Sequence, residues 1–120
     1  MAGFSDTLRS IADRIPQVRM LVIMGTDGIP VDRYVREADA SLEAIAAEYT
    51  TLLRASLTAA HDTGLGTLRE VTVVNDALTA LLIAITPEYF LFAALAPGAR
   101  VGEARFVLRL AGYALEPEFA

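Results

Sequence analysis

Residues 68–95, LREVTVVNDALTALLIAITPEYFLFAAL, decide the fold. The apolar stretches predict one strand over 68–74 and two buried strands, of about nine residues each, between 77 and 97. Tight turns separate the strands at Asn75-Asp76 and at Thr86-Pro87-Glu88-Tyr89, where proline takes the favoured second turn position. Strands joined by such short turns are antiparallel neighbours, so this stretch predicts a three-stranded meander.

The apolar segment Ala77–Pro97 also has the composition of a membrane span, because Glu88 is its only charged residue. As a transmembrane helix it would place Pro87 and Glu88 at the bilayer midplane, where the charge alone would cost about 2.5–3.5 kcal/mol. We therefore expect two strands here and no membrane insertion.

The N-terminal third predicts a helix and a hairpin. Ser5 is a candidate N-cap for a helix that runs to about Ile15. Two strands follow over 19–25 and 29–35, since Asp27-Gly28 supplies the positive φ angles that a hairpin turn needs. Pro30 in the second strand suggests that it lies at a sheet edge.

Two more helices complete the pattern. Asp39 is a candidate N-cap for a long helix over about 40–63, which Gly64 ends. A last helix covers about 101–115, with Phe106, Leu110 and Tyr113 or Ala114 aligned at helical spacing. The order is α-β-β-α-β-β-β-α, and the long helix must cross one face of the sheet.

The long helix has two faces with different side chains. One apolar stripe predicts the ordinary core face: Leu42, Ala46, Tyr49, Leu53, Leu57 and Ala60. The opposite stripe carries small, neutral residues, where exposed helices usually carry charges: Ala44, Ala47, Thr51, Ala55 and Thr58. We interpret this small-residue stripe as an interface for another helix. The alternative is that alanine is simply a good helix former on a solvated surface.

The strand over 68–74 offers a second docking surface. It contains no proline and no signal for a bulge, so its open edge could pair with a copy of itself across a two-fold axis. The predicted strand contacts are Leu68, Glu70, Val71, Thr72 and Val73.

Composition excludes several classes of function. The 120 residues are 54% hydrophobic and 21% charged, enough for one packed domain over residues 1–120. The net charge of −5 argues against a nucleic-acid binder. With no cysteine and one histidine, the chain lacks thiolate chemistry and any multi-histidine metal site, and without lysine it cannot form a Walker A loop.

The remaining polar residues do not form an enzyme site. His61 has no second ligand or base nearby in the sequence, so we predict a surface or cap histidine. The pairs Glu116 with Glu118 and Asp27 with Asp32 are expected to be solvated. Gly64-Leu65-Gly66 follows a helix and precedes a strand, the reverse of a phosphate-binding loop, and is predicted to be a helix stop. Arg100 and Arg105 could reach an acidic partner but are more often surface arginines.

Several local patterns together resemble the Roadblock/dynein light chain family. The resemblance covers essentially the whole chain. It rests on the hairpin Asp27-Gly28-Ile29-Pro30-Val31, the alanine-rich long helix, the strands 68–73 and 89–95, and Gly102 with Arg105, Leu108 and Arg109, which is similar to the family's L-G-x-x-R opening of its last helix.

This resemblance implies an α/β sandwich, with a five-stranded antiparallel sheet, the long helix on one face and the terminal helices on the other. Family members dimerise by joining the strand after the long helix to its twin, with the long helices side by side. Their recurrent role is to bind and regulate small Ras-like GTPases. A bacterial MglB-type member is the activating partner of an MglA-type GTPase and has no catalytic residues of its own.

We therefore expect a non-enzymatic cytoplasmic homodimer that binds a small, MglA-like GTPase and stimulates GTP hydrolysis, with no cofactor and no metal. Glu43, Glu48 and Arg54 flank the small-residue stripe and are candidate GTPase contacts. Three alternatives stay open. They are a scaffold or sensor-kinase-associated adaptor without effect on GTP turnover, a heterodimer with a second protein of the same shape, and a small-ligand enzyme with an apolar pocket.

Overall fold

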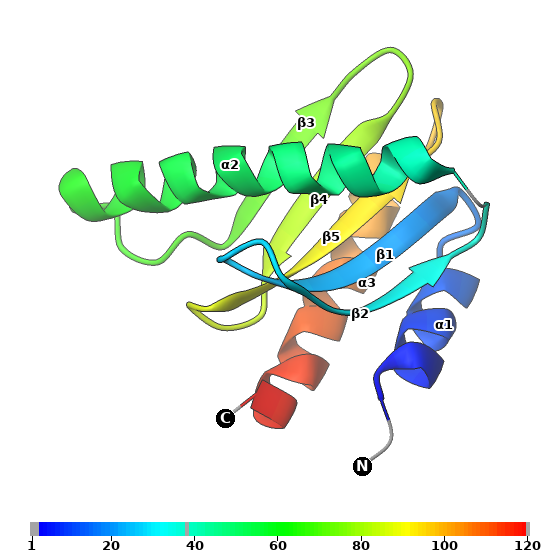
Figure 1. The fold of residues 1–120 in the computed structure, drawn as a ribbon, viewed down its shortest axis with the longest axis horizontal. Helices are drawn as coiled ribbons and strands as arrows, with labels where there is room; N and C mark the ends of the chain where they lie inside the picture. The colour runs from blue at the N-terminus through cyan, green and yellow to red at the C-terminus, as the bar shows by residue number, and fades with distance from the viewer. Residues whose placement is uncertain (1–2, 38, 120) are drawn as a thin grey trace.

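Five strands form one sheet in the computed structural model, which describes residues 3–37 and 39–119. They are β1 (Val18–Gly25), β2 (Pro30–Val35), β3 (Glu70–Val74), β4 (Thr79–Ala84) and β5 (Tyr89–Leu95). Across the sheet the order is β2-β1-β5-β4-β3, and every neighbouring pair is antiparallel. The predicted hairpin and meander therefore meet where β1 pairs with β5 (Figure 1).

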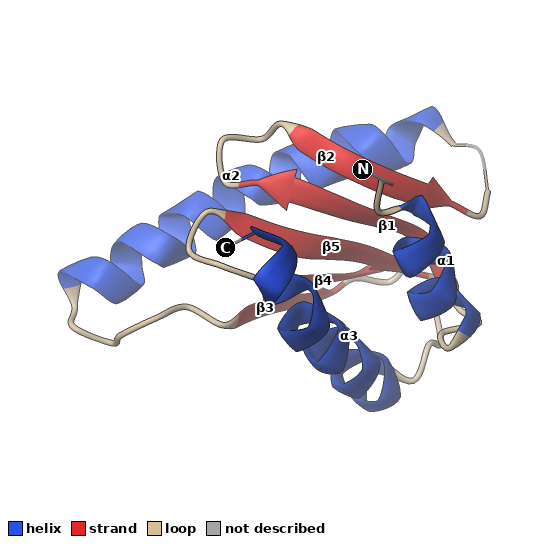
Figure 2. Cartoon of the chain, turned by 90° about the horizontal axis from the view of Figure 1, so that it is seen from below, coloured by secondary structure: helices blue, strands red, loops and turns tan. Residues whose placement is uncertain are grey.

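Three helices cover the two faces of this sheet. α1 (Ser5–Asp13) and α3 (Val101–Leu115) lie on one face, and α2 (Ala40–Asp62) crosses the other (Figure 2). A short 3-10 turn over Glu116–Phe119 follows α3. This arrangement confirms the predicted fold class and element order. It also leaves β2 and β3 as the two edge strands, as Pro30 suggested for β2.

The central strands are apolar on both faces because each face is covered. In β1, side chains alternate between Leu21 and Ile23, which pack with α1 and α3, and Met20 and Val22, which pack with α2. β4 and β5 alternate in the same way. A strand buried on both faces is expected to be a continuous apolar run, so Ala77–Pro97 forms strands. No helix in the described part of the chain is long and apolar enough to cross a membrane.

The ends of α2 follow the predicted signals. The Asp39 carboxylate accepts a hydrogen bond from the Ser41 backbone N–H at 2.9 Å, and bonds from the Ser41 hydroxyl and N–H hold the pKa of Asp39 below its ordinary value. Gly64 adopts φ 68°, and the N–H of Leu65 reaches back to the Ala60 carbonyl at 2.9 Å. Gly64 is thus a helix stop, as the sequence predicted.

The predicted capping role of Ser5 is wrong. Phe4 occupies the cap position of α1 without a side-chain cap. The Ser5 hydroxyl instead donates to the Asp32 carboxylate in β2, which also accepts the Phe4 N–H at 2.8 Å. A tertiary partner on the neighbouring strand therefore replaces the local cap. Asp32, predicted to be solvated, is consequently half-buried.

A single arginine provides hydrogen bonds at the C-terminal end of α1. The Arg36 guanidinium donates to four carbonyl oxygens, those of Ala12, Ile15, Pro16 and Val18, at 2.7–3.1 Å. The last carbonyls of a helix lack internal partners and favour positive charge. Arg36 thus ties the end of β2 to the turn between α1 and β1.

The stripe of Phe106, Leu110 and Tyr113 on α3 is exposed: the three side chains are 62%, 43% and 66% exposed. The face of α3 that packs on the sheet instead carries Ala104, Val107, Leu108, Ala111, Gly112 and Leu115. Small residues let the helix approach closely, since a Cβ at Gly112 would lie 3.4 Å from the Ala84 carbonyl oxygen. The buried face of α3 therefore combines the aliphatic side chains of Val107, Leu108 and Leu115 with a close approach to the sheet at Gly112.

Candidate interaction surface

The small-residue stripe of α2 faces away from the sheet. Ala44, Ala47, Thr51, Ala55 and Thr58 are all exposed. The opposite side of the helix carries the buried residues Leu42, Ala46, Thr50, Leu53 and Ala60, with Tyr49 and Leu57 half-buried. The two faces predicted from helical periodicity thus lie where we expected them, and the small-residue stripe forms an uncharged outer surface.

The three charged residues predicted to flank the stripe do not lie together. Glu43 forms an ion pair with Arg33 in β2, and Arg54 donates to the Thr26 carbonyl in the β1–β2 turn at 3.1 Å. These two therefore lie on the side of α2 that faces the hairpin. Glu48 is exposed on the other flank, since it is separated from Glu43 and Arg54 by well over 90° of helical rotation.

The flank of α2 that faces β3 carries apolar side chains beside Glu48. Tyr49 defines this side, because its hydroxyl accepts a hydrogen bond from the Asn75 amide, directly after β3, at 3.0 Å. One turn away, Leu52 is 39% exposed and Ile45 is half-buried. Leu52 was not among the predicted contacts, although a leucine outside the core stripe was the available signal.

β3 presents an open edge beside this flank. It pairs with β4 from Glu70 opposite Ile83 to Val74 opposite Thr79, and its other edge pairs with no strand in the described ranges. The strand is shorter than predicted: it begins at Glu70, so the predicted contact Leu68 lies in the segment that leads into it. Val71 and Val73 alternate toward α2, while Glu70 and Thr72 alternate toward α3.

Glu70 joins this edge strand to α3. Its carboxylate accepts hydrogen bonds from Arg109 Nε at 3.0 Å and from the Thr72 hydroxyl at 3.0 Å, and it forms an ion pair with Arg105. Burial alone would raise the pKa of Glu70, but the two arginines and Thr72 hold that pKa below the ordinary 4.5. Arg105, predicted as a surface residue, therefore pairs with an acidic residue of its own chain.

The Glu70→Gln variant is expected to lose stability near neutral pH, because two guanidinium groups lose their carboxylate. A carboxyl group whose pKa is lowered by folding stabilises the protein above its ordinary value of 4.5, and this stabilisation is lost as the pH falls through the lowered pKa. The deficit of the variant should therefore shrink in acid. Urea unfolding from about pH 7 to about pH 3 measures this difference.

Glu103→Gln is the matched control, because among residues 3–37 and 39–119 Glu103 pairs only with Arg100, and both side chains are more than 70% exposed. Exposed pairs of this kind contribute little. A deficit for Glu70→Gln that stayed constant with pH would contradict a carboxylate role for Glu70.

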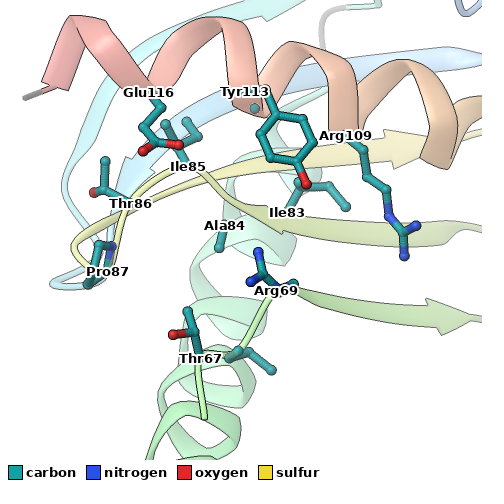
Figure 3. Close-up of a pocket in the computed structure, with 12 residues that line it drawn as sticks. Thr67, Arg69, Ile83, Ala84, Ile85, Thr86, Pro87, Arg109, Tyr113 and Glu116 are labelled. Atoms are coloured by element: carbon teal, nitrogen blue, oxygen red, sulfur yellow. The ribbon is translucent and has the colours of Figure 1, made fainter.

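A cavity of about 460 Å³ lies between the end of α3 and the segment before β3 (Figure 3). Arg69 from that segment and Arg109 and Tyr113 from α3 line the cavity together with Glu116. Its floor is formed by Ile83, Ala84 and Ile85. The lining combines one carboxylate and two guanidinium groups with the hydroxyl groups of Thr67, Thr86 and Tyr113, and it contains no histidine or serine.

The other polar residues are placed as surface groups. The His61 side chain is 90% exposed and lies 3.3 Å from Asp62, the only acidic group near it in the described residues. Asp27, Glu116 and Glu118 are exposed. Within residues 3–37 and 39–119, no three histidine or acidic side chains gather where they could hold a metal ion.

No protein-family model matches the sequence, and no curated protein matches it. Many solved structures are similar to it, including the following three. MglC from Myxococcus xanthus is 30% identical, covers 96% of this chain and 98% of its own, and has a TM-score of 0.69. A Roadblock/LC7 domain from Streptomyces avermitilis is 17% identical, covers 98% of both chains and has a TM-score of 0.85. An MglB with a tetrameric arrangement is 13% identical, covers 93% of this chain and 84% of its own, and has a TM-score of 0.81.

The similarity extends over nearly the full length in each case, and it includes the same helix-covered sheet described above. The relative at 30% identity adds sequence agreement to agreement of fold. The chain belongs to the Roadblock/LC7 family.

Proposed function

We propose that this chain is a non-catalytic homodimeric module that binds a small Ras-like GTPase and stimulates its GTP hydrolysis. The observation that carries the proposal is the continuity of two unpartnered surfaces, the outer face of α2 and the open edge of β3. An uncharged helix face beside an open strand suits a second protein better than it suits water.

In the proposed dimer, the β3 edges of two copies pair and their α2 helices lie side by side. The α2 residues nearest that seam are Ile45, Glu48, Leu52 and the adjacent stripe members Ala44, Thr51 and Ala55, so Glu48 would face the second copy rather than the GTPase. The tetrameric arrangement of the similar MglB supports self-association as a property of this fold. Ala47 and Thr58 lie on the hairpin side of the stripe, farther from the seam.

The proposed GTPase surface is that hairpin side. Arg54 and Glu43 are exposed there next to Ala47 and Thr58. Such a surface can regulate without catalytic residues, because a partner that binds one arrangement of the GTPase loops more tightly shifts their population toward it. A preference of about 3 kcal/mol for the hydrolytic arrangement corresponds to roughly a hundredfold in rate.

A scaffold that binds without changing GTP turnover is the second candidate. The same surfaces support it, because a scaffold and an activator can bind the GTPase in the same place. Only the activator binds one arrangement of the GTPase loops more tightly than the other.

The first test is the mass in solution. The single chain is 12.9 kDa, so multi-angle light scattering should give about twice that mass at micromolar concentration. A mass that stays at one chain over the working range would contradict the dimer.

The second test is GTP turnover by the small Ras-like GTPase encoded nearest to this chain, with and without the purified protein. We expect faster hydrolysis, and we expect Arg54→Glu to weaken binding by at least about tenfold through charge reversal at the interface. Arg9→Glu on α1, the far side of the sheet, is the control with the same charge change. Binding with unchanged turnover would favour the scaffold, and no binding at micromolar concentration would exclude this GTPase as the partner.

A further inference from the structure

A groove runs along the open edge of β3, and we call it the edge groove. It has a volume of about 580 Å³. It is lined by Leu68, Arg69, Glu70, Thr72, Arg105 and Arg109 and continues to Leu65 and Val101. The groove therefore extends from the segment before β3 to the side chains of α3.

The edge groove carries an excess of positive charge. Arg105 and Arg109 share the single carboxylate of Glu70, and Arg69 forms no ion pair with any described residue. The Arg105 and Arg109 side chains are still 41% and 56% exposed, so their remaining N–H groups are accessible. A guanidinium group has five donors, and one carboxylate shared between two guanidinium groups leaves several of them free.

The same chain carries the complementary features at the other end of β3. Val74, the last residue of the strand, is 69% exposed. Asp76 lies in the turn after it, is exposed, and forms no ion pair within the described part of the chain. An exposed apolar side chain followed by an unpaired carboxylate is the complement of an apolar, arginine-lined groove.

Strand geometry brings these two ends together in a symmetric pair. If β3 pairs with a copy across a two-fold axis normal to the sheet, residues directly opposite each other point to the same side of the sheet. The axis therefore lies midway between one residue and its own copy, and we call it an axis through that residue. An axis through Thr72 pairs all five residues of β3 with all five of the copy, with Glu70 opposite Val74 and Val71 opposite Val73.

The neighbouring registers are worse. An axis through Val73 would place Glu70 opposite Asp76 of the copy, a like-charge pair, and would draw the turn residues into the ladder. An axis through Val71 would require Leu68 and Arg69, which precede the strand, to pair as well. The register with the axis through Thr72 therefore pairs only residues that belong to β3, and it places no two like charges opposite each other.

We infer that the edge groove receives the β3–β4 turn of a second copy, with Asp76 of that copy facing Arg105 and Arg109. This inference rests on the proposed dimer and adds the contact that makes a second copy of this chain the favoured partner. Val74 of the second copy covers the stems of the two arginines. A different protein without an acidic residue at this turn would leave the positive excess unpaired, so the groove favours self-association over a heterodimer.

The test uses charge reversal on the full chain. Asp76→Arg should raise the dimer dissociation constant by at least about tenfold, because the change occurs at both symmetric contacts of one dimer. Asp13→Arg, at the exposed end of α1, makes the same charge change away from β3 and should shift the constant less than about threefold. Circular dichroism and urea unfolding establish that each variant is folded.

The reciprocal variant tests the pairing itself. Arg109→Glu should also weaken the dimer, while Asp76→Arg combined with Arg109→Glu should restore it to within about threefold of the wild type, because the charges are exchanged. The inference would be wrong if Asp76→Arg dimerised as tightly as Asp13→Arg, or if the double variant dimerised no more tightly than the single variants. The proposed dimer itself would stand in either case. A wild type that is monomeric throughout would overturn the dimer and the inference together.

Discussion

Replacing Leu52 with glutamate is expected to convert the dimer into a monomer. Leu52 is 39% exposed on the flank of α2 that faces the β3 edge, where the proposed seam would cover it. A carboxylate buried there without a partner costs about 3 kcal/mol or more, which is at least roughly a hundredfold in the dissociation constant, and the symmetric dimer carries the change twice. Light scattering and sedimentation over a concentration series measure the constant.

Ala47→Glu is the matched control for Leu52→Glu. Both positions are exposed on α2 and both variants gain one carboxylate, but Ala47 lies on the hairpin side of the outer stripe. We expect Ala47→Glu to remain dimeric and to weaken GTPase binding instead. If Ala47→Glu dissociated the dimer and Leu52→Glu did not, the seam would lie on the other flank of α2.

Replacing Phe92 with alanine is expected to lower the free energy of unfolding by about 3–5 kcal/mol. Phe92 is fully buried in β5, lies opposite Val22 and Leu82 in the neighbouring strands, and stacks with Tyr49 of α2 at 6.3 Å between ring centroids. Its removal leaves a cavity between sheet and helix that the close-packed strands cannot collapse to fill. This loss is a large share of the roughly 5–15 kcal/mol that stabilises a domain.

Phe106→Ala provides the comparison for Phe92→Ala, because it removes the same atoms from a side chain that is 62% exposed on α3. It should change stability by no more than about 0.5 kcal/mol. Urea unfolding at one fixed protein concentration keeps the contribution of dimerisation constant between variants. Comparable losses for the two variants would mean that the α3 stripe is covered in solution.

The sequence was sufficient for the elements and their order. Continuous apolar runs, short turns and the stop at Gly64 depend on neighbours within a few residues. The end of α2 lies where it was predicted, and β4 and β5 lie within the predicted segment but have 6 and 7 residues rather than about nine. The antiparallel pairing within the hairpin and within the meander followed from the turn lengths, but the pairing of β1 with β5, which joins the two units, did not. The outer face of α2 followed from helical periodicity, which also depends only on local spacing.

Long-range contacts were not predictable in the same way. Ser5 has a suitable side chain for a cap, but Asp32 in β2 binds it instead. α3 carries apolar residues on two faces, and helical spacing alone did not indicate which of them packs on the sheet. The Glu70 cluster joins residues 39 positions apart, and nothing in the spacing of Glu70 and Arg109 marks them as neighbours.

The two edges of the sheet are held by groups that respond differently to acid. On the β2 side, Arg36 binds four backbone carbonyls, and neither the guanidinium nor a carbonyl changes its charge at any pH a cell experiences. On the β3 side, the bond between strand and α3 depends on the ionised form of Glu70. Acidification therefore weakens the contact that Glu70 makes between β3 and α3 but leaves the Arg36 contacts intact, and β3 is the edge through which two copies would join.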